Sequence, residues 1–431
     1  MAARQNIFRV RRSYNQWVAN QTLEDYALRF TAKSARRWSA ARVSNTALGA
    51  ISFLALEAIG GSITLHYGFD NAVAAILAVS LVIFLTAIPI SYYAARYGVD
   101  IDLLTRGAGF GYIGSTITSL IYASFTFIFF AIEAAIMAMA LEMLFGIPLV
   151  LGYLICSVVI IPFVIHGITT ISRFQVWTQP AFIFLQLVPF VFIVYADASS
   201  VSDWTQFEGL NPVDSGGFSI VMFGAAAAVV FSLIAQIGEQ VDFLRFIPEP
   251  RNAREKRRWW AAVMAGGPGW IVIGMLKILA GSFLAVLALK QGVTASEAAD
   301  PTQMYLIAFN YITHSPEISL AMAGIFVILC QLKINVTNAY AGSIAWSNFF
   351  SRLTHSHPGR VVWLFFNVAI ALLVMELGVY RALEETLGFY GIVAIGWVGS
   401  LVADLVINKP LGLSSNVPTC TTSTRSALVP C

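Results

Sequence analysis

The chain has 431 residues, of which 58% are hydrophobic and 11% are charged, whereas ordinary soluble domains average about 45–50% and about 25%. This composition argues against a cytosolic enzyme. The 26 Lys and Arg residues and the 23 Asp and Glu residues give a net charge of +3, which is too balanced to indicate a nucleic-acid surface. The four cysteines lack the spacing of a zinc site.

Ten hydrophobic runs follow a polar, Arg-rich segment at residues 1–43. A transmembrane helix needs about 20 apolar residues to cross a bilayer. The sequence therefore predicts an all-α polytopic membrane protein whose main partner is the lipid bilayer. The runs lie near residues 44–66, 71–94, 115–144, 147–170, 176–197, 217–247, 259–289, 317–349, 361–378 and 388–407.

Positive charge falls mainly on one side of the predicted membrane. When the joints between runs are assigned alternately to two sides, 22 of the 26 Lys and Arg residues share the side of residues 1–43. Cytoplasmic loops of membrane proteins carry the excess of Lys and Arg. We therefore expect a multi-pass protein of the plasma (inner) membrane with a cytoplasmic N-terminal tail.

The first and sixth runs are interrupted at matching places. Gly60 and Gly61 lie within the first run, and Gly238 lies among polar residues in the sixth. Since five spans make up each half, residues 44–197 and 217–407 are predicted to form two inverted repeats. Transporters of this kind bind substrate where the helices are broken and half-helix ends present free N–H and C=O groups. The alternative is that these glycines only allow close helix packing.

Ionisable side chains inside the predicted spans are site candidates, because a charge at mid-bilayer costs about 2.5–3.5 kcal/mol even on lenient scales. Glu133 is one of them, and Phe129 lies four residues earlier on the same helical face. This pair suits a flat ligand that forms hydrogen bonds. The alternative is a structural acid paired with a neighbouring group such as Lys333. The remaining candidates are Glu57, Glu239, Asp242 and Lys277.

The eighth run carries a polar stripe that cannot face lipid. Gln331, Asn335, Asn338 and Gly342 recur at helical spacing. Side-chain amides supply both donors and acceptors, which recognition of a heterocyclic amide requires. The alternative is a set of interhelical hydrogen bonds that only holds the bundle together.

Several strings, taken in order, resemble the purine and cytosine permeases of the nucleobase:cation symporter-1 family. ISYYAARYGVDIDLLTRGAGFGYIGS, from residue 90, resembles the segment between their second and third spans. DFLRF at 242–246 and VAD at 402–404 are similar to the ends of their sixth and tenth spans, and the eighth run matches an N-x-x-N-x-Y-x-x-G-like pattern. The resemblance covers about residues 25–410 and implies a LeuT-type five-plus-five inverted-repeat helix bundle.

The resemblance also implies site residues. In this family an aromatic residue and, four positions on, an amide or acid contact the substrate from the third span. The sixth span would contribute residues 232–236, where an aromatic residue of some relatives is replaced by Leu233, so stacking is expected to be weaker. Together with the breaks, the predicted substrate-binding residues are Gly60, Gly61, Phe129, Glu133, Leu233, Gln236, Gly238, Asn335 and Asn338.

The coupling ion is where the chain departs most from the family. Lys333 and Ile334 stand where sodium-coupled relatives have hydroxyl residues. We expect the Lys333 ammonium to replace sodium as a fixed positive charge against carbonyls of the first span. Sodium coupling is therefore doubtful, and proton coupling or uniport is at least equally favoured. Neither a cofactor nor a metal is expected.

The predicted function is that of a secondary active transporter, not an enzyme, for a nucleobase or related heterocycle such as cytosine, purine, uracil, hydantoin or allantoin. The alternative is a transporter-like sensory input module of a truncated signalling protein. Residues 198–216 are predicted to form an external acidic loop. The family usually has twelve spans against ten here. In the atypical tail at residues 408–431, the last 19 residues are rich in Ser and Thr, and they fit a shifted reading frame better than a functional tail. The oligomeric state is not predicted.

Overall fold

Helices form almost all of the secondary structure in the described part of the chain. The computed structural model describes residues 30, 31, 33, 36–210, 217–313, 315–354 and 358–414. Within these residues the only β pairing is an isolated bridge between Phe30 and Val99. The predicted all-α fold class is therefore confirmed.

Seven helical segments of the described chain are long and apolar enough to cross a membrane, which confirms a multi-pass membrane protein. A 3-10 helix, η3 (Ser232–Gln236), and two π-helical turns, η2 (Arg106–Phe110) and η4 (Asp404–Asn408), interrupt or end longer helices. The α-helices are α2 (Ala40–Gly49), α3 (Ala55–Tyr97), α4 (Ile101–Thr105), α5 (Gly111–Phe145), α6 (Leu149–Ile165), α7 (Gly167–Ala196), α8 (Ser199–Thr205), α9 (Ile220–Phe231), α10 (Ile237–Leu244), α11 (Ala253–Gly266), α12 (Trp270–Lys290), α13 (Pro301–Asn310), α14 (Pro316–Thr354), α15 (Arg360–Glu376) and α16 (Leu383–Ala403).

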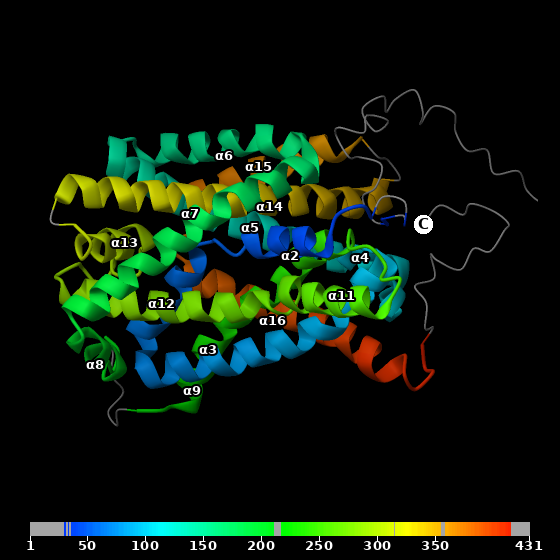
Figure 1. The fold of residues 1–431 in the computed structure, drawn as a ribbon, viewed down its shortest axis with the longest axis horizontal. Coiled ribbons are helices and arrows are strands. Elements are labelled where there is room, and N and C mark those ends of the chain that lie inside the picture. Colours follow the sequence, from blue (N-terminus) through cyan, green and yellow to red (C-terminus); the bar gives the residue numbers. More distant parts are fainter. Residues whose placement is uncertain are drawn as a thin grey trace, which may run out of the picture.

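The long helices run side by side along the longest axis of the molecule (Figure 1). α14 packs mainly on α5, and α12 packs mainly on α3. α7 crosses obliquely between α14 and α12 on the face seen in Figure 1. The predicted site residues lie on α3, α5, η3, α10 and α14.

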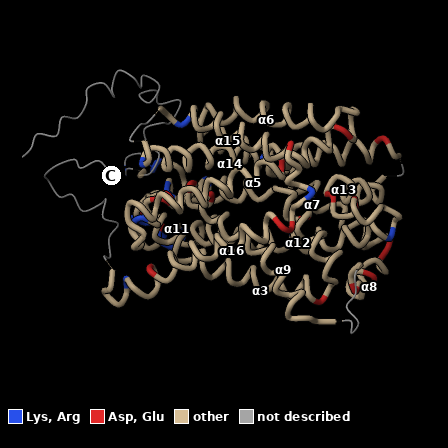
Figure 2. The backbone as a smooth tube through the Cα atoms, turned by 180° about the vertical axis from the view of Figure 1, so that it is seen from behind, with Lys and Arg blue, Asp and Glu red and all other residues tan. Residues whose placement is uncertain are grey.

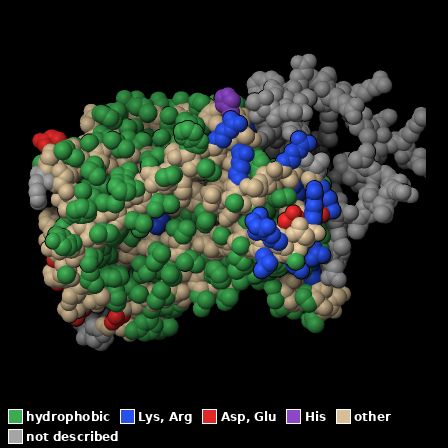
Figure 3. Space-filling model, in the orientation of Figure 1, with side chains coloured by type: hydrophobic (Ala, Val, Ile, Leu, Met, Phe, Trp, Pro, Cys, Tyr) green, Lys and Arg blue, Asp and Glu red, His purple; other side chains and the backbone are tan. Residues whose placement is uncertain are grey.

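The two ends of the bundle differ in charge. α8 and α13 lie at one end, and α4 and α11 lie at the other (Figure 1). Lys and Arg gather at the end with α4 and α11, whereas the opposite end carries mainly Asp and Glu (Figures 2 and 3). The face between these ends that Figure 3 shows is covered mainly by hydrophobic side chains, as expected for a protein surrounded by lipid.

The first predicted span is broken, but not at the predicted glycines. α2 ends at Gly49 and α3 begins at Ala55, so residues 50–54 form the break. Gly60 and Gly61 lie inside α3, where a Cβ on Gly60 would stand 1.9 Å from the Ile278 carbonyl oxygen of α12. The prediction of a break at these glycines is therefore wrong, and the packing alternative explains them, because α3 and α12 meet backbone to backbone.

The sixth predicted span is also interrupted a few residues before its glycine. α9 passes into the 3-10 helix η3, and α10 begins at Ile237. Gly238 lies within α10, where an added Cβ would stand 2.4 Å from the ring of Tyr122. Gly238 is thus a packing residue as well, and the interruption itself is η3.

Several predicted boundaries shift. The first helix begins at Ala40, where the Ser39 hydroxyl accepts the N–H of Arg42 at 3.2 Å, and not at residue 44. The predicted joint between the first two spans is a bend inside α3, where Gly68 has φ 76°. The larger parts of the predicted tails lie outside the described residues, as do residues 211–216 of the predicted external loop. The division into two repeats of five spans stays a prediction.

Candidate functional site

The Glu133 carboxylate lies at the break in the first span. Its oxygens accept the N–H groups of Leu54 and Ala55, each at 3.2 Å. These N–H groups belong to the start of α3, where no helical carbonyl is available to them, and a negative charge is favoured at a helix N-terminus. Glu133 is therefore an N-terminal cap donated to α3 by α5, and it is fully buried.

Phe129 lies one turn before Glu133 on the same face of α5, as predicted. Its ring contacts that of Phe53, within the break, edge to face at a centroid distance of 6.3 Å. On the other side it contacts Phe125 at 4.6 Å. Phe129 is 1% exposed, so it forms an aromatic wall directly beside the break.

The second interruption brings together polar side chains that lack partners. In η3 and α10, Gln236 donates to Glu239 Oε2 at 2.8 Å. Within the described residues, Ser232 Oγ and Glu239 Oε1 are buried without a hydrogen-bond partner. Leu233 is fully buried between these polar residues. An unpaired buried polar atom costs about 1–3 kcal/mol, so this region favours an added polar partner.

The amide stripe of α14 is buried and incompletely hydrogen-bonded. Gln331, Asn335 and Asn338 are all fully buried. Asn338 donates to Asn335 at 3.4 Å, whereas Gln331 Nε2, Asn335 Nδ2 and Asn338 Oδ1 have no partner among the described residues. Gln331 Oε1 also accepts the Leu54 N–H at 3.4 Å, which places this stripe at the first break. Two donors and one acceptor are therefore available there.

Lys333 lies on a different side of α14 from this stripe. Its ammonium donates to the Gln175 carbonyl at 3.2 Å, to Gln175 Oε1 at 2.8 Å and to Thr178 Oγ1 at 2.9 Å, all on α7. None of its hydrogen bonds within the described chain goes to α3 or to Glu133. The expectation that Lys333 faces carbonyls of the first span, and the alternative that it pairs with Glu133, are therefore both wrong in their geometry.

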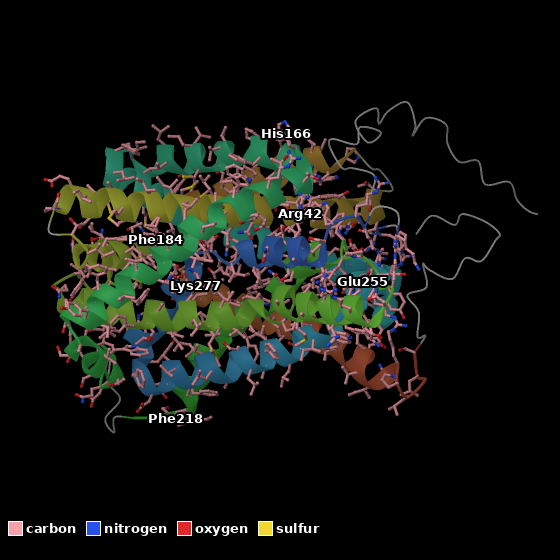
Figure 4. All side chains as sticks on the ribbon, viewed as in Figure 1. Arg42, His166, Phe184, Phe218, Glu255 and Lys277 are labelled. Atoms are coloured by element: carbon pink, nitrogen blue, oxygen red, sulfur yellow. The ribbon has the colours of Figure 1, made fainter. Side chains whose placement is uncertain are left out.

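Glu57 and Lys277, two further ionisable residues predicted inside the spans, form a buried ion pair. Lys277 of α12 donates to Glu57 Oε1 at 2.6 Å and to Gln186 of α7 at 3.1 Å. Tyr305 of α13 donates to the same Glu57 oxygen at 3.0 Å. Figure 4 shows Lys277 between α7 and α12. The sequence identifies both charges but not this pairing, because Gln186 and Tyr305 carry no signal of their own.

A second cluster of polar side chains lies at the end of the bundle with α4 and α11. Arg352 pairs with Asp102, and Asn348 donates to Asp100 at 3.1 Å. Tyr122 donates to Asp242 at 3.1 Å. These residues connect α4, α5, α10 and α14. The DFLRF string therefore contributes Asp242 to a buried structural network at this end of the bundle.

Comparisons with known proteins agree with this architecture. The model of a family of permeases for cytosine/purines, uracil, thiamine and allantoin matches residues 31–416. A search of curated proteins finds no match. Mhp1, a nucleobase-cation-symport-1 family transporter, in a closed conformation with bromovinylhydantoin bound, is 17% identical with a TM-score of 0.67, over 89% of this chain and 81% of that chain.

Two further structures support the same fold. The inward-facing conformation of Mhp1 gives a TM-score of 0.63 at 18% identity, over 88% of this chain and 80% of that chain. A Na+-coupled sialic acid symporter in a substrate-bound outward-open state gives 0.61 at 14% identity, over 91% and 83%. The chain has the LeuT-type fold of these transporters and is not an enzyme. It belongs to the family of permeases for cytosine and purines, uracil, thiamine and allantoin.

Proposed function

We propose that the protein is a secondary active transporter that carries a nucleobase or related heterocycle, such as cytosine, a purine, uracil, hydantoin or allantoin, by alternating access. It would lie in the plasma membrane with its N-terminus in the cytoplasm. The gathering of Lys and Arg at the end with α4 and α11 supports this orientation (Figure 3). Family membership supports the substrate class, as does the bromovinylhydantoin bound to Mhp1.

The unpaired amide atoms of α14 are the observation that carries the substrate assignment. A heterocycle with an N–H beside a C=O offers one donor and one acceptor along one edge. Asn335 Nδ2 and Asn338 Oδ1 offer the complementary pair and lack partners in the described structure. Phe129 adds an aromatic wall, and base–aromatic stacking contributes about 1–3 kcal/mol. A flat amide-containing ring satisfies both features, whereas an aliphatic substrate cannot stack on the aromatic wall.

A thermal-shift screen of the purified protein against purines, pyrimidines, hydantoins and allantoin tests this proposal. A ligand at about 100 times its Kd adds about 2.7 kcal/mol of stability, which gives a measurable rise in Tm. Asn335→Ala and Asn338→Ala are each expected to weaken the best ligand at least tenfold. Asn310→Ala, which removes an exposed asparagine at the end of α13, is the matched control and should leave affinity unchanged. Unchanged affinity in both α14 variants would remove this stripe from the site.

Uptake by the protein in sealed proteoliposomes separates transport from sensing. A transporter accumulates the ligand found in the screen, whereas a sensory module binds it without moving it. Binding with no uptake above protein-free vesicles would contradict the transport proposal while leaving the binding site intact.

We further propose that binding does not require sodium. A buried ammonium in α14 already supplies a positive charge beside α7, held by three acceptors from Gln175 and Thr178. A second cation close by would be repelled in this low-dielectric region. Replacing sodium by choline is expected to change the Kd by less than twofold. A Kd at least tenfold weaker in choline would contradict sodium-independent binding.

A further inference from the structure

A long apolar groove opens on the side of the bundle between α2 and α7. It has a volume of about 650 Å3. Its wall is mostly formed by α7, on which Phe184 projects outward (Figure 4), and Asn45 of α2 and Gln179 of α7 are its polar members. The apolar wall consists of Val176, Pro180, Ile183, Phe184, Leu187 and Val188.

The groove has the length of one membrane leaflet. From Val176 to Val188 the helix advances about 18 Å at about 1.5 Å per residue. The hydrocarbon core of a bilayer is about 30 Å thick, so one leaflet occupies about 15 Å. Ile183 is 45% exposed and Leu187 is 58% exposed, so the wall is open to the surrounding lipid along this length.

A second hollow continues the groove toward the positively charged end. It has a volume of about 480 Å3, shares Asn45 with the groove, and lies between α2 and α11. Ser39, which caps α2, and Ser44 of α2 line it on one side, and Arg258 of α11 lines it on the other. The two hollows therefore adjoin at Asn45, and the second is lined by the exposed Arg258.

Three arginines lie near the two hollows. Arg173 precedes Val176 by three residues, or about 4.5 Å along α7. Arg42 of α2 donates to Ser172 at 3.1 Å, and Arg173 lies close enough for its charge to act on Arg42. Neither these two arginines nor Arg258 forms an ion pair with any carboxylate that the structure describes.

On α11, the Glu255 carboxylate instead accepts the Arg251 N–H at 2.8 Å. Arg173 lies one helical turn before the groove, Arg42 contacts the adjacent Ser172, and Arg258 lines the adjoining hollow. These three arginines, two of them mutually repelling, favour a ligand that has an anionic head and an apolar tail. A zwitterionic lipid offers no net charge to offset this repulsion.

We propose that this groove binds an anionic phospholipid of the leaflet on the α4 and α11 side, with its phosphate near Arg173 and Arg258 and one acyl chain along α7. The lipid would contact the outer side of the helix that holds the Lys333 ammonium through Gln175 and Thr178. The proposal requires no particular substrate, so it stands or falls separately from the proposed transport activity.

Native mass spectrometry of the full chain tests the charge requirement. The protein is taken from nanodiscs of phosphatidylcholine with and without phosphatidylglycerol, and the retained lipids are counted. We expect preferential retention of phosphatidylglycerol. Arg173→Gln with Arg258→Gln should weaken binding of this lipid about 25-fold, the product of about fivefold per cation near a membrane surface. Lys290→Gln with Arg381→Gln, at the opposite end, is the matched control and should retain it as the unchanged protein does.

A second pair of variants tests the groove itself. Ile183→Trp fills the wall and should expel the retained lipid, whereas Val194→Trp, eleven residues later on the same face of α7, should not. The Tm of every variant is measured to confirm folding. Equal retention of the two lipid classes, or undiminished phosphatidylglycerol in the Arg173 and Arg258 double variant, would overturn the proposal. Retention unaffected by Ile183→Trp would place the lipid elsewhere and overturn it as well.

Discussion

The two interruptions occupy corresponding spans, but their polar groups are satisfied in different ways. At residues 50–54, the N–H groups that open α3 are bound by Glu133 from the neighbouring helix α5. At η3, Ser232 Oγ and Glu239 Oε1 are buried without a partner in the described structure. The backbone N–H groups at the first interruption are thus bound by the protein itself, while side chains of the second interruption are left with unused hydrogen-bonding capacity.

This difference changes how Glu133 is interpreted. A carboxylate that caps a half-helix cannot offer the same lone pairs to a substrate without giving up those hydrogen bonds. Its main effect on the site is therefore to hold the start of α3, and with it Phe53, against Phe129. The unpaired amides of α14 and the polar residues of η3 and α10 are better placed to select the ligand.

Glycine substitutions near the two interruptions should give the largest difference in stability between them. Gly60→Ala places a methyl group 1.9 Å from the Ile278 carbonyl oxygen, which only a shift of α12 can relieve. We expect a loss of about 3 kcal/mol or more, at the upper end of overpacking costs. Gly238→Ala meets the ring of Tyr122 at 2.4 Å, and a ring can move more easily than a backbone. We expect about 1–2 kcal/mol there.

Thermal unfolding monitored by size-exclusion chromatography in detergent measures both effects. Gly224→Ala in α9 is the control, because nothing lies within 4 Å of its added methyl group, and its Tm should match that of the unchanged protein. If Gly238→Ala lowers the Tm more than Gly60→Ala, the close contact of α3 with α12 is not the tighter of the two.

Much of the fold follows from the sequence because membrane helices can be recognised by their length and hydrophobicity. The all-α architecture could be predicted in this way. The interruption of the first and sixth spans was inferred from glycines, and both spans are interrupted, although at other residues. The positions of the interruptions could not be predicted, because Gly60 and Gly238 have the same signature whether they break a helix or allow it to pack. The residues that actually break the first span, 50–54, include ordinary apolar residues that carry no such signal.

The site was partly predictable for a similar reason. Glu133 and Phe129 share a helical face, so their position beside the break follows once the helix is assigned. The partners of Lys333 and Lys277 depend on which helices meet, and spacing along one helix says nothing about this. Gln175 and Gln186 are inconspicuous in the sequence, yet each provides a hydrogen bond to a buried ammonium.

Substitutions of Glu133 and Glu239 should change stability less than Gly60→Ala, and they compare the roles of the two carboxylates in stability and in ligand binding. Glu133→Ala leaves the Leu54 and Ala55 N–H groups without their acceptors, so we expect a loss of about 1–3 kcal/mol together with loss of ligand binding. The protein should remain monodisperse in size-exclusion chromatography, and Glu133→Gln, which keeps one acceptor oxygen, should recover part of the stability.

Glu239→Gln is the matched change at the second interruption. It replaces a buried carboxylate that has one unpaired oxygen with a neutral amide of similar shape. The expected change in stability is within about 1 kcal/mol, because little is lost in the empty protein. Its effect should appear in ligand affinity, measured by the same thermal-shift titration.

If Glu133→Ala keeps full stability and loses only binding, the Glu133 carboxylate serves the substrate and not α3. If Glu239→Gln destabilises the protein as strongly as Glu133→Ala, both interruptions are structurally satisfied, and the ligand must find its hydrogen bonds on α14 alone.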